Sequence, residues 1–148
     1  MKKLLVLSWL LYFSATCKQV PTEPQLIFIN ANSQGWSGGA MGSGHGTNYN
    51  FYFINKGAAV TCDSVWINGF VLPVKQTVNS KSDTVHVSAM AFYRGSVGPQ
   101  DNRAAVEPKK ENPPIPVKGT ALISYKSGKG VKYIEAPVVK QLTPLAYP

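Results

Sequence analysis

An Asn-Gly pair between two runs of β-forming residues is the feature that most constrains what this chain can fold into. Residues 65–67 (Val-Trp-Ile) precede Asn68-Gly69, and residues 70–72 (Phe-Val-Leu) follow it. A two-residue type I′ turn needs positive φ at both central positions, and Asn-Gly adopts this conformation readily. The stretch 63–74 therefore predicts a β-hairpin around which the other strands pack, with Trp66 in the core.

The rest of the chain also has the pattern of short strands separated by turns. Residues 83–92 (DTVHVSAMAF) alternate between two faces, and no segment shows a sustained helical period. Pro73 predicts a sheet edge or a bulge in its strand, and the link 93–116 is too rich in proline and glycine for a helix. We expect seven strands, with an eighth short one at 138–142; they are 25–30, 49–54, 59–67, 70–78, 83–92, 120–125 and 131–136.

This pattern predicts an all-β fold, a single antiparallel β-sandwich that is Ig-like in size. Charged residues make up 15% of the chain, below the globular average of about 25%, which suits an exported β-protein. We place the domain at residues 25–148, after a proline-containing tether at 17–24.

The N-terminus has the order of a secretory signal. Lys2 and Lys3 precede an apolar run at 4–13, and small residues follow at 14–16. Ten apolar residues are too few to span a bilayer as a stable helix. We therefore expect residues 1–16 to be a signal peptide that is removed on export.

Cys17 comes directly after these small residues. Residues 1–17 resemble the signal and lipobox of bacterial lipoproteins, although Ser14 and Thr16 stand where a lipobox usually has Leu and then Gly or Ala. The resemblance implies that Cys17 becomes the first mature residue, carries acyl chains and anchors the protein to a membrane. Lys18 after the cysteine implies sorting to the outer membrane.

The two cysteines leave an alternative open. If Cys17 is acylated, Cys62 is an unpaired thiol in a strand, where it acts as a small hydrophobic residue. If ordinary signal peptidase cuts nearby, Cys17 and Cys62 are free to form a disulfide in a periplasmic or secreted domain.

The charge of the chain does not indicate nucleic-acid binding. Without Lys2 and Lys3, 13 basic residues remain against 7 acidic ones. The remaining lysines are scattered along the chain. A nucleic-acid-binding face usually has clustered basic residues interleaved with aromatic ones. We expect no nucleic-acid partner.

Residues 35–39 (Gly-Trp-Ser-Gly-Gly) match the nucleophile motif G-x-S-x-G, in which Ser37 would be activated by His86 and by Asp63 or Asp83. That motif requires a helix after the serine, whereas a glycine-rich stretch follows here. We therefore expect no catalytic residue, with a small serine hydrolase using Ser37 as the alternative.

The sequence shows no metal or cofactor site. His45 and His86 are the only histidines, and their spacing matches no metal-ligand pattern. The glycines at 42, 44 and 46 form no phosphate loop, because no lysine or helix follows. We expect neither a metal nor a cofactor.

Trp36 is the candidate ligand contact. It lies in what the sequence predicts to be a glycine-rich loop at 32–48, where an aromatic side chain suits a sugar face or a protein partner. The alternative is that Trp36 folds back and covers the core. These observations favour a non-enzymatic binding or accessory module, anchored at the cell envelope through Cys17. An unanchored, secreted structural subunit is a further alternative.

Overall fold

The protein is all-β, as the sequence predicts. The computed structural model describes residues 25–39, 43–79, 82–94, 108–128 and 130–148, and within these ranges every regular element is a strand. The predicted signal, tether and Cys17 lie outside the described residues. The strands are β1 (Gln25–Ser37), β2 (His45–Lys56), β3 (Thr61–Ile67), β4 (Phe70–Asn79), β5 (Thr84–Tyr93), β6 (Lys109–Lys110), β7 (Ala121–Ser127), β8 (Gly130–Ala136) and β9 (Lys140–Ala146).

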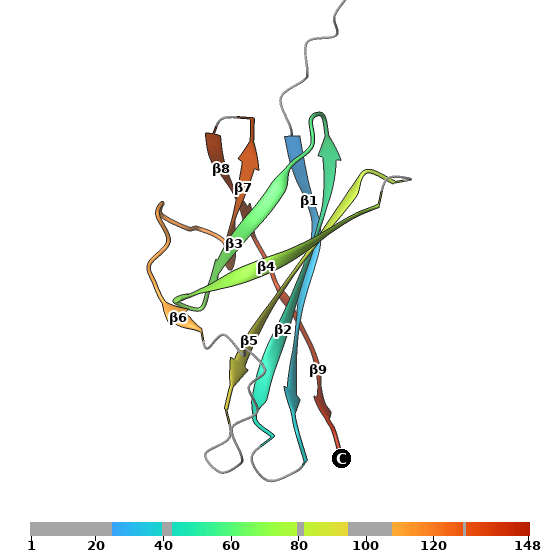
Figure 1. The fold of residues 1–148 in the computed structure, drawn as a ribbon, viewed down its shortest axis with the longest axis vertical. Helices are drawn as coiled ribbons and strands as arrows, with labels where there is room; N and C mark the ends of the chain where they lie inside the picture. Colours follow the sequence, from blue (N-terminus) through green and yellow to red (C-terminus); the bar gives the residue numbers. More distant parts are fainter. Residues whose placement is uncertain (1–24, 40–42, 80–81, 95–107, 129) are drawn as a thin grey trace, which may run out of the picture.

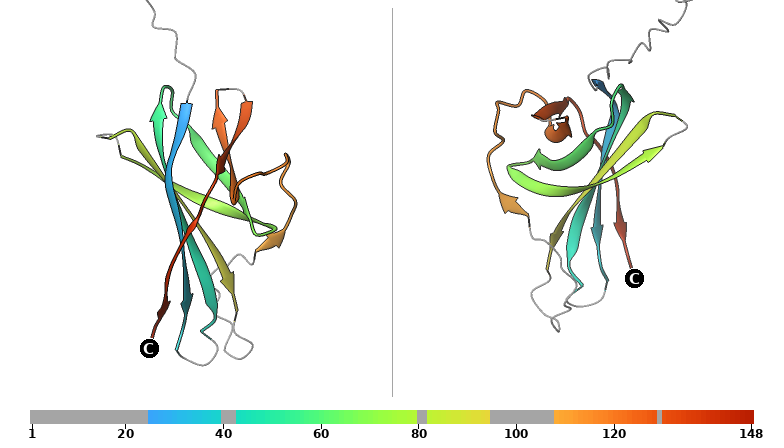
Figure 2. Two further views of the ribbon diagram at one scale, coloured as in Figure 1. Left: turned by 180° about the vertical axis from the view of Figure 1, so that it is seen from behind. Right: turned by 45° about the horizontal axis from the view of Figure 1, so that its top comes forward.

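All nine strands belong to one continuous, curled sheet (Figures 1 and 2). Its order is β8-β7-β3-β4-β5-β2-β1-β9, and β6 pairs with β4 beside this path. Neighbouring strands are antiparallel except at one edge, where β9 runs parallel to β1. The short strand β6 lies within the link that the sequence predicts to be irregular.

The central hairpin forms as predicted. Ile67 pairs with Phe70, and the two residues between them have positive φ, 53° at Asn68 and 78° at Gly69. These values are those of a type I′ turn, whose twist matches the twist of the flanking strands. The local sequence thus sets the register of β3 against β4.

β4 is the strand that joins the two halves of the sheet. Its first residues, Phe70 to Pro73, pair with β3, whereas Val74 to Asn79 pair with β5 (Figure 1). Proline has no N–H to donate to a sheet ladder, so Pro73 suits the point where β4 changes partners. Beyond it, the Gln76 side chain bonds to the backbone of the chain at the start of β3.

The core lies inside the curl and draws on both halves of the sheet. Alternate residues of β2 and β5 point inward, as the period of two predicts, and Phe51, Phe53, Val85 and Val87 are fully buried. β3 and β7 add Val65, Ile67 and Ile123 to the same cluster, and β4 adds Leu72.

Trp66 does not belong to this core, contrary to the sequence prediction. It alternates with the core-facing Val65 and Ile67, so it points to the other face of β3 and is only half-buried. There its ring packs edge-on against Tyr133, with 6.1 Å between ring centroids. All three residues of the run 65–67 are hydrophobic, so the sequence alone does not show which of them face the core. Here Trp66 can point away from it because Tyr133 provides an aromatic contact on the other face of the sheet.

Candidate functional site

The outward face of β1, β2 and β5 carries an unusual concentration of carboxamides. Because alternate residues share a face, the strand register places these side chains in rows across the sheet. One row contains Asn32, Asn50 and Ser88; the next contains Gln34, Asn48 and Met90. We call this surface the amide face; its polar members are Asn30, Asn32, Gln34, Asn48, Asn50, Tyr52, His86 and Ser88.

A chain of hydrogen bonds fixes three members of the amide face. The Oδ1 atom of Asn50 lies 3.0 Å from Nε2 of His86, and its Nδ2 atom donates to Oδ1 of Asn32 at 3.2 Å. An amide oxygen only accepts, so Nε2 of His86 carries the donated hydrogen. The His86 ring also stacks on Tyr52, with 4.7 Å between centroids. The orientation of each of these groups is therefore set by its neighbour.

Trp36, the predicted ligand contact, lies at one end of this face. Its ring stacks on Phe92 with a centroid distance of 5.7 Å and an interplanar angle of 24°, and Tyr147 packs edge-on against it. Gly46 lies between Trp36 and Phe92 in the same row. A Cβ on Gly46 would stand 2.9 Å from the indole, so glycine is required for the indole to cross this strand. We call Trp36, Phe92 and Tyr147 the aromatic end; the first two are partly exposed and Tyr147 is exposed.

The glycine-rich stretch is mostly strand, which corrects the prediction of a loop at 32–48. β1 continues to Ser37 and β2 begins at His45, and the two are paired throughout. Glycine lowers strand propensity locally, but cross-strand pairing and the packing of Trp36 over Gly46 outweigh that cost. Trp36 therefore belongs to the sheet face and not to a loop.

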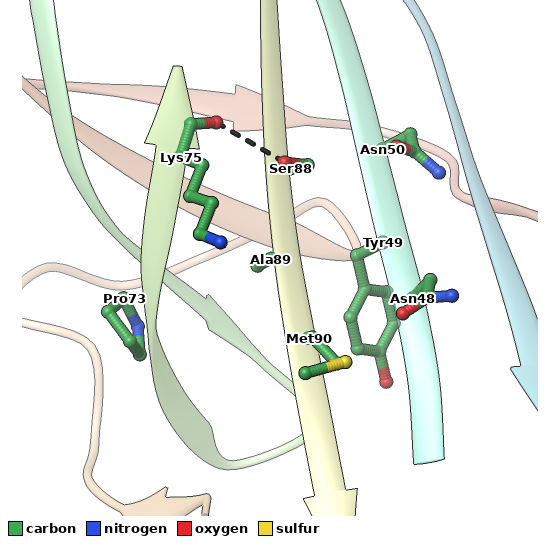
Figure 3. Close-up of a pocket in the computed structure, with 8 residues that line it drawn as sticks. All are labelled: Asn48, Tyr49, Asn50, Pro73, Lys75, Ser88, Ala89 and Met90. Carbon is green, nitrogen blue, oxygen red and sulfur yellow. Dashed lines mark hydrogen bonds between the residues drawn. The ribbon is translucent and has the colours of Figure 1, made fainter. Parts of the chain in front are cut away.

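A pocket opens beside the amide face where β4 separates from β5. Its volume is about 420 Å³, and its lining includes Asn48, Asn50, Pro73, Lys75 and Met90. Figure 3 shows Lys75, Ser88 and Asn50 side by side across three neighbouring strands, with Ser88 donating to the Lys75 carbonyl at 3.4 Å. Tyr49 also lines the pocket, and burial raises the pKa of its hydroxyl.

The residues of the alternative hydrolase hypothesis are not brought together. Ser37 pairs across the sheet with His45, whereas His86 pairs with Tyr52. The β5 residue in the same row as Ser37 is Tyr93. His86 is seven residues before Tyr93 on this strand, a distance of about 23 Å in an extended chain. His45 itself stacks on Tyr93. Within the described ranges, no cluster of three or more His, Cys, Asp and Glu residues could hold a metal ion.

Cys62 is buried at the start of β3. The residue is 6% exposed and belongs to the core cluster, and burial raises the pKa of its thiol to about 11. Its backbone N–H donates to Oε1 of Gln76 at 2.6 Å. The prediction that Cys62 packs as a small hydrophobic residue is therefore confirmed.

Sequence reasoning missed the amide face. The alternation of 83–92 places His86, Ser88 and Met90 on one side, and the same alternation in β2 collects Asn48, Asn50 and Tyr52. Those signals were present in the sequence. The pairing of β1 with β2 and of β2 with β5 was not, and only this pairing unites the three sets.

Neither the family models, nor the curated proteins, nor the solved structures contain a match to this chain. Across the parts of the chain that the structure describes, no helix is long and apolar enough to cross a membrane.

Proposed function

We propose that this chain is an exported, lipid-anchored β-domain that acts as a non-enzymatic binding module at the cell envelope. The amide face with its aromatic end is the observation that carries this proposal. Hydrogen bonds orient the side chains of Asn32, Gln34 and Asn50, and a preorganised surface loses less entropy when a ligand binds. The finer architecture, an Ig-sized sandwich whose two halves face each other, is part of the same proposal and is supported by the shared core.

The position of Cys62 supports acylation of Cys17 over a disulfide. Two bridged cysteines need Cβ atoms about 3.8 Å apart. Because Cys62 is 6% exposed, the segment around Cys17 would have to enter the core to reach it. Acylation leaves the packing around Cys62 undisturbed. Several acyl chains give stable attachment, since one chain alone binds membranes only marginally. The choice of the outer membrane rests on Lys18 after the cysteine.

The anchoring is tested by phase separation in a detergent that clouds on warming. The wild type should enter the detergent phase, and the Cys17→Ser variant should move to the aqueous phase with an unchanged circular dichroism spectrum. Blocking the lipoprotein signal peptidase with globomycin should make the uncut precursor accumulate. A Cys17–Cys62 disulfide in the wild type, or a Cys17→Ser variant that stays with the membrane, would refute the anchor and favour a secreted subunit.

The hydrolase alternative has its own test. A fluorophosphonate probe should leave the wild type unlabelled, because Ser37 lies far from His86 along the sheet. Labelling that disappears in Ser37→Ala would contradict the binding-module proposal. The matched control is Ser88→Ala, a serine on the same sheet that is outside the motif.

A further inference from the structure

The amide face is long enough to hold several units of a linear ligand. From Trp36 to Asn30 the strand β1 advances six residues, which is about 20 Å of extended chain. The rows of β2 and β5 follow it over this distance without a register shift. The surface therefore suits an extended chain better than a single small molecule.

The amide face offers hydrogen-bond donors and acceptors and carries no negative charge. Every carboxamide offers two donor hydrogens and an acceptor oxygen. The outward positions of β1, β2, β5 and the second half of β4 contain no carboxylate, and their cations are Lys75 and Lys56, the latter at the end of β2 away from Trp36. At the edge of the face, Lys140 of β9 pairs with Asn32. Neutral hydroxyl groups also donate and accept, so they complement such a surface.

The distribution of apolar groups argues against a protein or a nucleic acid as the ligand. The cores of protein–protein interfaces are apolar, whereas the two central rows on β1, β2 and β5 contain Asn32, Asn50, Gln34 and Asn48. Their large apolar side chains are Met90 and, at the β9 edge, Leu142. Nucleic acids require clustered cations. Pyranose rings, in contrast, present an apolar C–H face that packs on an aromatic ring and hydroxyls that bond to amides.

We propose that the amide face and the aromatic end bind a neutral polysaccharide chain, with one sugar ring against Trp36 and its neighbours on Asn48 and Asn50. This inference rests on the binding-module function and names its ligand class. Asn48 is the amide best placed to contact the ligand directly. It lies between Gln34 and Met90, and in the described part of the chain its side chain makes no hydrogen bond. Gln34, by comparison, is already bonded to the Thr143 carbonyl.

The test uses the full-length mature protein in detergent micelles. Binding to neutral glycans is measured as retardation of the protein in gels that contain starch, β-glucan, xylan or galactomannan. Binding to the cell wall is measured by co-sedimentation with peptidoglycan sacculi. The comparison shows whether the ligand is an external glycan or the cell wall. Polygalacturonate serves as the acidic comparison. Neutral-glycan binding should persist at about 1 M NaCl, where charges are screened beyond ~3 Å.

Two variants test the proposed contacts. Asn48→Ala and Trp36→Ala should each weaken retention about tenfold, a change of about 1.4 kcal/mol. Asn112→Ala, an exposed amide outside this face, is the matched control and should bind like the wild type. Trp36→Ala also removes the stack on Phe92, so thermal melts must accompany it, whereas Asn48→Ala breaks no internal bond and should melt unchanged.

The outcomes separate this inference from the function on which it rests. If no neutral glycan is retained and the sacculus does not bind at about 1 M NaCl, or if only polygalacturonate binds and salt abolishes it, the glycan inference is wrong. Crosslinking of the face to an envelope protein, lost in Asn48→Ala, would preserve the binding module while overturning its glycan ligand. If Asn48→Ala and Trp36→Ala change no binding of any kind, both proposals fail.

Discussion

Gln76 bridges a gap in the sheet, and its replacement by leucine should destabilise the fold. After Pro73, β4 pairs with β5 and no longer with β3. The Gln76 side chain makes the connection that the backbone no longer makes: Oε1 accepts from the Cys62 N–H at 2.6 Å, and Nε2 donates to the Val60 carbonyl at 2.8 Å. Both of these backbone partners belong to buried residues.

The size of the effect follows from these two bonds. Each contributes about 0.5–1.5 kcal/mol net, and a buried backbone group left without a partner costs about 1–3 kcal/mol. The added apolar contact of leucine offsets part of this. We therefore expect Gln76→Leu to lower the free energy of unfolding by about 2–3 kcal/mol. For a domain of this size the melting temperature should fall by roughly 6–12 °C.

Urea denaturation followed by circular dichroism measures this change, with Thr77→Ala as the control. Thr77 is the exposed neighbour on the opposite face, so its truncation should stay within about 0.5 kcal/mol of the wild type. A Gln76→Leu variant as stable as Thr77→Ala would refute the bridging role.

A charge variant tests the same bridge by a different route. In Gln76→Glu an ionised carboxylate would still accept from Cys62 but would face the Val60 carbonyl, whereas the protonated acid could donate to it. The folded-state pKa of this glutamate should therefore rise above its unfolded value of about 4.3. Its stabilising contribution is then present below about pH 4.3 and is lost as the pH rises through the folded pKa. Relative to the wild type, Gln76→Glu should be least destabilised in acid; a pH-independent difference would contradict this.

Three further predictions concern the turn, the aromatic end and the buried thiol. Gly69→Val should cost about 1–3 kcal/mol in a thermal melt, because φ is +78° there and a β-branched residue resists it, although nothing within 4 Å would contact the added Cβ. Gly46→Ala should disturb the stack of Trp36 on Phe92, because the new Cβ would lie 2.5 Å from the Ala91 carbonyl oxygen and 2.9 Å from the indole. The measurement is near-ultraviolet circular dichroism, which should lose intensity; an unchanged spectrum would contradict that packing. Cys62 should resist iodoacetamide at pH 8 until the protein unfolds. Because its folded pKa is raised to about 11 from 9.0, its contribution to stability should be present below pH 9 and be lost between pH 9 and 11.

Local chemistry in the sequence was enough to predict several elements. Asn68-Gly69 determined the central hairpin, because the positive φ of a type I′ turn is a property of those two residues themselves. The alternation of 83–92 likewise determined which side chains of β5 face the core, since a strand has a period of two whatever its partners. The all-β class follows from the same local patterns.

Other features depended on contacts between segments far apart in the chain. Residues 32–48 read as a loop because glycine lacks strand propensity, yet pairing between β1 and β2 and the indole over Gly46 make residues 32–37 and 45–48 part of the sheet. Trp66 faces away from the main core because side chains alternate along β3 and its neighbours Val65 and Ile67 take the core-facing positions.

The candidate site belongs entirely to this second class. Asn32, Asn50 and His86 are ordinary polar residues in sequence, separated by 18 and 36 positions, and only the order β5-β2-β1 places them in one hydrogen-bonded chain. Strand order and register are set by the packing of the whole core, in which many weak contacts act together. Residue identity thus decided the turn and the faces of single strands, while the tertiary structure decided which of those faces lie side by side.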